Sequence, residues 1–143
     1  MTVKSILLSK GRDVTTTEPA ATVESAIALL AQRRIGALVV LGPERRVIGI
    51  VSERDIVRVL AEQGPAVLSA PIAQVMTRKV STCSENDTVS ALMEQMTAGK
   101  FRHVPVLDRE QLVGIISIGD VVKHRLGEME RESEALRDYI QTA

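Results

Sequence analysis

The chain carries one nine-residue motif twice, first as Gly49-Ile50-Val51-Ser52-Glu53-Arg54-Asp55-Ile56-Val57 and again as Gly114-Ile115-Ile116-Ser117-Ile118-Gly119-Asp120-Val121-Val122. Five of the nine positions are identical, and two others exchange one aliphatic residue for another. Upstream of the motif, Thr22-Val23 corresponds to Thr88-Val89, and the first copy holds one extra residue in the polar turn before the motif. This internal repeat indicates that the chain contains two copies of one supersecondary unit.

Each copy has a helical pattern ahead of the motif. Apolar residues recur at i, i+3, i+4 and i+7 from Val23 in the first copy and from Val89 in the second. This spacing predicts two amphipathic helices. The expected caps are Thr22 and either Asp87 or Thr88 at the N-termini, with Gly36 and Gly99 as left-handed residues near the C-termini.

Short aliphatic runs rich in β-branched residues follow each helix and predict two buried hairpins. The paired runs are 37–41 with 47–51, and 104–107 with 112–116. A second helix is expected after each hairpin, over 55–63 before Gly64 and over 120–126 before Gly127. With extended runs near Val14 and Val80, each unit has the predicted order β-α-β-β-α.

Two further segments lie outside the repeated units. Residues 69–76 contain Pro71 where a helix would start, so the linker is expected to be a helical turn that holds the units close together. The segment after Gly127 is strongly charged, with Met129, Leu136 and Ile140 forming a narrow apolar stripe. This pattern predicts a surface helix or a helix that contacts a partner.

Composition excludes several classes of function. Eighteen basic and eighteen acidic residues balance in 143 residues, and Phe101 and Tyr139 are the only aromatic residues. A protein that coats nucleic acid needs a positive surface or stacking rings, so we expect no nucleic-acid partner. The single Cys83 indicates a reducing compartment, with the cytoplasm as the expected location. The apolar run at residues 6–8 is too short to act as a signal peptide or to span a membrane, so no membrane role is expected.

The repeated Ser-x-x-Asp lies where a buried strand is expected to end and a helix to begin, and it has two interpretations. In one, Ser52 and Ser117 are N-caps and each acid reaches back to complete a capping box. In the other, the free amides of the first helical turn bind an anion, while the Asp holds both hydroxyls of a ribose. Together these groups would suit a nucleotide.

Charged and titratable residues near the motif are candidate binding groups but do not predict catalysis. Basic residues gather at the loops, and Arg54 and Arg102, beside the motifs, are the best candidates for binding phosphate. His103 and His124 are the only histidines, and neither has a Cys or acid at metal-ligand spacing. We therefore expect neither a metal site nor a catalytic residue. A small hydrolase or redox enzyme using His103 and Asp120 is the weakest alternative.

The two motifs, together with Phe101-Arg102-His103-Val104-Pro105-Val106, resemble a tandem pair of CBS domains over roughly residues 3–126. The resemblance implies an α/β (α+β) fold of two pseudo-symmetric β-α-β-β-α units packed through their sheets. It also implies two clefts that bind AMP, ADP, ATP, NAD(H) or S-adenosylmethionine, with regulation and not turnover as the role. The implied domains are residues 1–68 with the N-terminal segment, 69–126 with the linker turn, and 127–143 as the charged helix.

The resemblance also implies roles for individual residues. Asp55 and Asp120 would hold ribose hydroxyls, and Ser52 and Ser117 would contact phosphate. The backbones of Gly36, Ala37 and Leu38 and of His103, Val104 and Pro105 would surround the base, while Thr77, Lys79 and Val80 would line the cleft of the second repeat. The segment Lys10-Gly11-Arg12 would either cover the cleft of the first repeat or bind a further phosphate.

The expected function is a nucleotide sensor, with AMP or ATP as the first candidate ligand and NAD(H) next. The alternative is a structural or dimerisation module whose clefts are vestigial, so that Ser-x-x-Asp only caps helices. The family resemblance further implies a homodimer. The charged C-terminal helix would complete that dimer or dock on a client enzyme or transporter.

Overall fold

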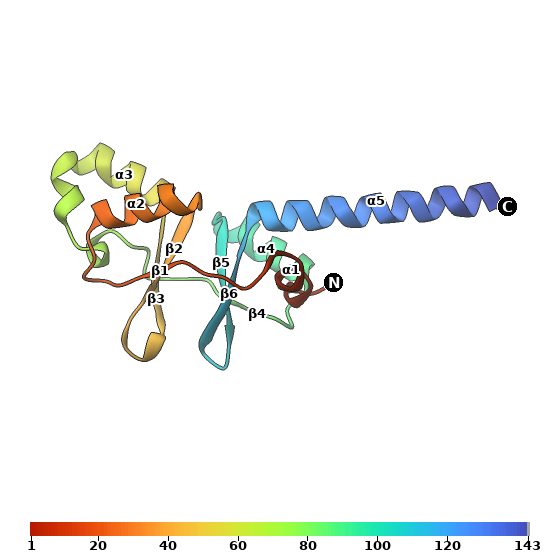
Figure 1. The fold of residues 1–143 in the computed structure, drawn as a ribbon, viewed down its shortest axis with the longest axis horizontal. Coiled ribbons are helices and arrows are strands. Elements are labelled where there is room, and N and C mark those ends of the chain that lie inside the picture. Colours follow the sequence, from red (N-terminus) through yellow and green to blue (C-terminus); the bar gives the residue numbers. More distant parts are fainter. Residues whose placement is uncertain (143) are drawn as a thin grey trace.

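The computed structural model, which describes residues 1–142, contains two units that each carry a three-stranded sheet. The first unit contains β1 (Thr16–Thr17), α2 (Val23–Arg33), β2 (Ala37–Leu41), β3 (Val47–Ser52) and α3 (Glu53–Gln63). The second contains β4 (Cys83–Ser84), α4 (Val89–Gly99), β5 (His103–Asp108), β6 (Gln111–Ser117) and α5 (Ile118–Thr142). The predicted order β-α-β-β-α is therefore confirmed. The sheets lie side by side at the centre, with the helices outside them (Figure 1).

The two sheets share one topology. The order is β1-β2-β3 in the first and β4-β5-β6 in the second, and in each the short first strand is parallel to the middle strand. The hairpin pairs Ala37 with Ser52 in the first unit and His103 with Ser117 in the second. Each hairpin therefore ends at the serine of the repeated motif, beside the start of the middle strand.

Each unit has its own hydrophobic core. Leu38, Val40 and Val51 pack with α2 and α3 in the first unit. In the second, Val104 and Val106 pack with α4 and with α1 (Val3–Lys10). The N-terminal segment, which the sequence assigned to the first unit, thus lies in the core of the second. Its hydrophobic pattern predicts burial but does not specify the core that receives it.

The linker packs on the first unit as α1 packs on the second. It forms two short turns, Pro65–Ser69 and Ile72–Gln74, and the second lies in the segment 69–76 that was predicted to form a helical turn. The side chain of Met76 covers Gly49, where an added Cβ would lie 2.4 Å from the Met76 sulfur, and Leu7 covers Gly114 with 2.7 Å to the nearest carbon. The two glycines of the motif therefore provide the space that lets these segments pack on the hairpins.

Three local predictions are wrong. The left-handed residues after α2 and α4 are Arg34 (φ 54°) and Lys100 (φ 57°) instead of Gly36 and Gly99. The first strands lie two or three residues beyond Val14 and Val80, because they pair with the middle of β2 and β5. The last helix does not end at Gly127 but continues to Thr142.

The helix passes through Gly127 because its neighbours support it. A glycine within a helix costs about 1 kcal/mol relative to alanine. Glu128 faces Arg125 (2.6 Å) and His124 (3.3 Å) one turn earlier, across the glycine. These pairs and the strong helix formers that follow offset the cost of one glycine. Desolvation would raise the pKa of Glu128, but the hydrogen bond from Arg125 and the charges of Arg125 and His124 together lower it.

Candidate functional site

Both copies of Ser-x-x-Asp form complete capping boxes. The Ser52 amide donates to an Asp55 carboxylate oxygen at 3.0 Å, and the Asp55 amide donates to the Ser52 hydroxyl at 3.2 Å. Ser117 and Asp120 repeat this pair at 2.9 and 3.1 Å. The capping interpretation is confirmed, and it leaves each Asp at the first turn of a helix, where negative charge is favoured.

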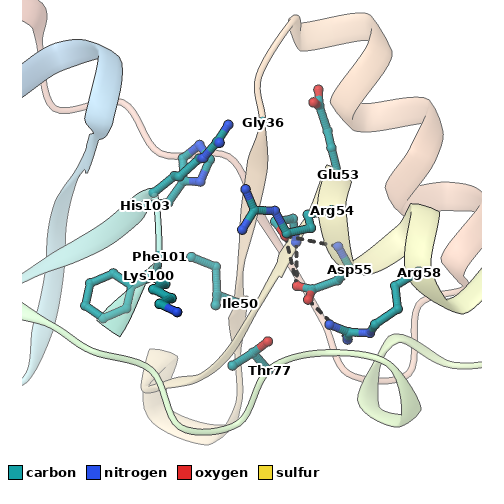
Figure 2. Close-up of a pocket in the computed structure, with 12 residues that line it drawn as sticks. Gly36, Ile50, Glu53, Arg54, Asp55, Arg58, Thr77, Lys100, Phe101 and His103 are labelled. Carbon is teal, nitrogen blue, oxygen red and sulfur yellow. Dashed lines mark hydrogen bonds and ion pairs between the residues drawn. The ribbon is translucent and has the colours of Figure 1, made fainter. Parts of the chain in front are cut away.

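A cavity of about 370 Å³ lies in front of the first capping box, and we name it the Asp55 cleft (Figure 2). Its walls come from both units and are formed by Gly36, Ile50, Ser52, Glu53, Arg54, Asp55, Arg58, Thr77, Lys100, Phe101, Arg102 and His103. Asp55 is only 7% exposed, and its second carboxylate oxygen pairs with Arg58 at 3.3 Å. The carboxylate thus lies at the base of the cleft with its charge balanced by an arginine.

The Asp55 cleft is positively charged. Arg54 and Arg58 come from α3 of the first unit, and Lys100 and Arg102 come from the loop after α4 in the second. The acidic residues that line the same cleft are Glu53 and Asp55. A cleft with two more cations than anions between low-dielectric walls attracts an anionic ligand.

A second cavity, of about 380 Å³, lies in front of the other capping box, and we name it the Asp120 cleft. It is lined by Lys10, Asp13, Val14, Thr15, Arg34, Ile35, Gly36, Ala37, His103, Ile115, Ser117 and Asp120. Its two cations and two acids balance. The lysine donates to an Asp120 carboxylate oxygen and to the Ile115 carbonyl, both at 2.7 Å. It therefore bridges the end of α1 to the motif.

The environment of Asp120 favours its charged form. Burial alone would raise the pKa of this carboxyl, but hydrogen bonds from Lys10 and from the Ser117 amide, with the lysine charge, lower it below its ordinary value. Of the two carboxylate oxygens, Oδ2 takes both bonds, and Oδ1 accepts none of the hydrogen bonds found within residues 1–142. Oδ1 is thus available to a ligand hydroxyl.

His103 and Gly36 separate the two clefts, since both residues line both cavities. A Cβ on Gly36 would lie 3.0 Å from His103 Nε2, so the ring packs against the glycine backbone. Burial lowers the pKa of His103, although Glu53 and Asp120 partly oppose this effect. The ring therefore lies between the two clefts and forms part of the wall of each.

The structure distributes the predicted site residues over the two clefts. Ser52, Arg54, Asp55, Thr77 and Arg102 line the Asp55 cleft, Ala37, Ser117 and Asp120 line the Asp120 cleft, and Gly36 and His103 line both. The other five predicted residues, Leu38, Val104, Pro105, Lys79 and Val80, line neither of these cavities. Leu38 and Val104 are completely buried in their cores.

The entry segments are exchanged relative to the prediction. Thr77 was expected beside Ser117 and Asp120, but it pairs with Ile50 and lines the Asp55 cleft. Lys10 was expected at the cleft of the first repeat, but it reaches Asp120. Both differences follow from the packing of α1 on the second unit and of the linker on the first.

Sequence reasoning missed two cations of the Asp55 cleft as site residues, Arg58 and Lys100. Arg58 lies one turn after Asp55 at i+3, so the helical period was a signal for it. Lys100 corresponds to Arg34 in the repeat, and each lines one cleft from a left-handed position after the preceding helix. Lys100 and Arg34 are basic loop residues in the sequence, but residue type alone did not distinguish them from solvated side chains.

The described residues lack two features of other classes of site. No group of three or more His, Cys, Asp or Glu side chains within residues 1–142 is placed to hold a metal ion. None of the helices described is both long and apolar enough to cross a bilayer. Cys83 is buried, and its pKa is raised to about 12 by desolvation and by the charge of Asp87.

The comparisons with known proteins agree with this architecture. The CBS domain family model matches residues 3–62 and 72–127. The CBS-domain containing protein ATU1752 from Agrobacterium tumefaciens is 48% identical, with a TM-score of 0.84 over 87% of this chain and 92% of that one. The mitochondrial CBS domain-containing protein CBSX3 from Arabidopsis thaliana is 33% identical over 98% of this chain and 72% of its own length. Of another Arabidopsis relative, CBSCBSPB1, this chain spans only 24%.

Related solved structures include complexes with adenosine derivatives. The CBS domain pair of protein MJ0100, in complex with 5′-methylthioadenosine and S-adenosyl-L-methionine, is 26% identical, with a TM-score of 0.80 over 90% of this chain and 98% of that one. Three observations lead to one family assignment: the family model matches twice, the two units share one topology, and each unit has a capping box at a cleft. The chain belongs to the CBS domain family and contains a tandem pair of these domains.

Proposed function

We propose that the chain is a non-catalytic regulatory module that binds an adenosine nucleotide in the Asp55 cleft. AMP is the first candidate, and ADP, ATP, NAD(H) and S-adenosylmethionine are the alternatives. The observation that carries the proposal is the set of four cations, contributed by both units, around the capping box of Asp55. A ligand that contacts cations of both units would link the units and change their relative arrangement or the partner that they bind.

The groups of the Asp55 cleft suit the parts of a nucleotide. Asp55 accepts hydrogen bonds, as ribose hydroxyls require, once Arg58 turns from it toward a phosphate. Arg54 and Arg102 offer planar guanidinium groups that bind phosphate through two hydrogen bonds. Gly36 and His103 line the cleft where the two units meet, and we propose that the adenine lies against them.

The Asp120 cleft is proposed as a second adenosine site of different preference. Its charges balance, and Lys10 occupies one oxygen of the carboxylate that would hold the ribose. An adenosine ligand without phosphate needs no net positive charge to bind there, whereas a polyphosphate would gain little electrostatic attraction from a cleft whose charges balance. The solved complex of the MJ0100 pair with two such adenosine derivatives supports this preference by analogy.

Calorimetric titration of the purified protein with adenosine, AMP, ADP, ATP, NAD, NADH and S-adenosylmethionine tests the proposal. We expect AMP to bind more tightly than adenosine, and AMP affinity to fall as salt is added, because exposed cations are screened. Arg54→Gln and Arg102→Gln should each weaken AMP binding, and Arg46→Gln, a matched change at an exposed arginine of the hairpin turn, should not. Failure of every ligand to bind would overturn the proposal.

The second candidate is a structural module that binds no nucleotide. One observation favours it: both Asp carboxylates already have partners, Arg58 and Lys10, and both capping boxes are complete without a ligand. In that case the cations of the Asp55 cleft are solvated surface residues. Identical melting temperatures with and without all seven ligands would support this candidate.

We further propose a cytoplasmic location, a homodimeric state and a client enzyme or transporter as the recipient of the signal. The location is supported by one free cysteine that is buried, which suits a reducing compartment. Affinity capture with the immobilised protein, in the presence and absence of AMP, would identify a client. A client whose capture does not depend on the nucleotide would argue against a sensor.

A further inference from the structure

Helix α5 extends far beyond the body of the molecule (Figure 1). It contacts α1 and α4 near its base, while its last turns project outward. Exposed apolar side chains recur along this helix, and the aliphatic ones from Val122 to Ile140 are 51% to 64% exposed. A helix that projects alone into water gains little from packing, so a helix of this composition is marginal without a partner.

The apolar residues of α5 follow a heptad pattern. Alternate steps of four and three residues connect Val122, Leu126, Met129, Ser133, Leu136 and Ile140. This spacing places Leu126, Ser133 and Ile140 at positions a, and Val122, Met129 and Leu136 at positions d. Five of these six residues are apolar. A seam of this kind pairs with a helix that carries the same repeat.

The charges that flank the seam determine which partner fits. Positions g hold Arg125 and Glu132, and the positions e of the following heptads hold Glu130 and Arg137. In a parallel pair, each g residue faces the e residue five positions later on the other helix. Arg125 would face Glu130 of a second copy, and Glu132 would face Arg137, so all four pairs across a two-fold axis join opposite charges.

The antiparallel arrangement of two copies is disfavoured by the same residues. When the seams overlap fully, positions e face e and positions g face g. Lys123 then meets Arg137, Glu130 meets Glu130 and Glu132 meets Glu132, so like charges oppose one another. Like charges at such pairs destabilise by amounts similar to those by which opposite charges stabilise.

We infer that α5 pairs with α5 of a second copy of this chain as a parallel two-stranded coiled coil over residues 122–140. The polar Ser133 at one a position fixes the register at a cost in stability. Arg125 must turn from Glu128 on its own helix, which it contacts at 2.6 Å, to reach the partner helix. The seam begins one residue after Val121, which is buried in the second unit, so the pair would join the two bodies at their α5 bases.

Two charge-exchange variants test the pairing by sedimentation velocity. Glu130→Arg with Arg137→Glu, and separately Arg125→Glu with Glu132→Arg, leave the net charge unchanged but place like charges at all four pairs. We expect the unmodified chain to be a dimer and each variant to dimerise about 30-fold more weakly or worse. An equimolar mixture of the two variants should form a heterodimer, because every pair across the seam is then opposite in charge.

Cross-linking tests the direction of the helices. In a parallel pair, residue 140 of one copy faces residue 140 of the other, so Ile140→Cys should form a disulfide between copies on oxidation. The matched control is Asp138→Cys at an outward f position, which should not. The native Cys83 is buried and should not contribute.

Several results would overturn the inference. A monomeric unmodified chain, dimers of unchanged affinity in both variants, or no recovery on mixing would each refute the charge pairing. Equal cross-linking at positions 138 and 140 would refute the parallel seam. Circular dichroism of each variant checks that α5 remains helical, so that a loss of dimer is not a loss of fold.

Discussion

Replacing Asp55 by alanine separates the two roles that its carboxylate could have. The substitution removes the hydrogen bond from the Ser52 amide and the ion pair with Arg58. Loss of a helix-capping residue costs about 0.5 to 2 kcal/mol, and the i,i+3 ion pair with the half-exposed Arg58 adds about 0.3 kcal/mol. We therefore expect the free energy of unfolding to fall by about 1 to 2 kcal/mol, which lowers the melting temperature by roughly 3 to 8 °C.

The expected effect of Asp55→Ala on AMP binding is larger. A hydrogen bond to a charged acceptor contributes about 1.5 to 3 kcal/mol, so losing one ribose hydroxyl contact weakens binding at least about tenfold, and losing two about a hundredfold or more. The assay is calorimetric titration at a temperature well below the melting transition of the variant. At that temperature the variant is folded, so its lower stability does not affect the measured affinity.

The matched control is Thr88→Ala. Thr88 caps α4 by accepting a hydrogen bond from the Ala91 amide at 3.1 Å, and it lines neither cleft. This variant should lose about 1 kcal/mol of stability without any change in AMP affinity. If Asp55→Ala weakens binding no more than Thr88→Ala does, the carboxylate only caps its helix, and the proposed role at the ribose is refuted.

Three further outcomes follow from single contacts. Gly114→Ala should destabilise the fold by about 1 to 3 kcal/mol, because the new methyl group would meet Leu7 at 2.7 Å. In chemical denaturation, the stability losses of Gly114→Ala and Leu7→Ala measured singly should sum to more than the loss of the double variant. Burial lowers the pKa of His103 below 6.5, so the unfolded chain binds a proton at a higher pH than the folded chain does. Stability should therefore decline as pH falls below about 6.5. His103→Gln should flatten that decline when melting temperature is measured against pH. With its pKa raised to about 12, Cys83 should resist alkylation by iodoacetamide at pH 8 and react only after unfolding; rapid reaction of the native chain would contradict its burial.

The repeat made most of the fold predictable. A nine-residue motif at the end of each hairpin, preceded by a helical period, fixed the element order of both units and the caps at Thr22 and Thr88. These features depend on local spacing, which a sequence displays directly. The capping boxes were predicted for the same reason, since their partners are three residues apart.

The clefts were less predictable because they depend on which segments meet in space. No local pattern in the sequence predicts that α1 packs on the second unit. This packing brings Lys10 to Asp120, while the linker on the first unit brings Thr77 to the Asp55 cleft. Left-handed backbone at Arg34 and Lys100 was also unexpected, because non-glycine residues seldom adopt it. In both cases tertiary contacts decided an outcome that residue type alone did not.

The exchanged segments also explain why the two clefts should not open equally. On the second unit α1 continues to Lys10, which is held by the Ile115 carbonyl as well as by Asp120. On the first unit the linker turn ends at Gln74, and the Asp55 carboxylate pairs instead with Arg58, whose side chain is 53% exposed. Because a half-exposed arginine with one ion pair moves more easily than a lysine held at two points, a ligand should enter the Asp55 cleft at a lower cost. A ligand that displaced Lys10 would instead act at the first turn of α5, the helix that we infer joins two copies.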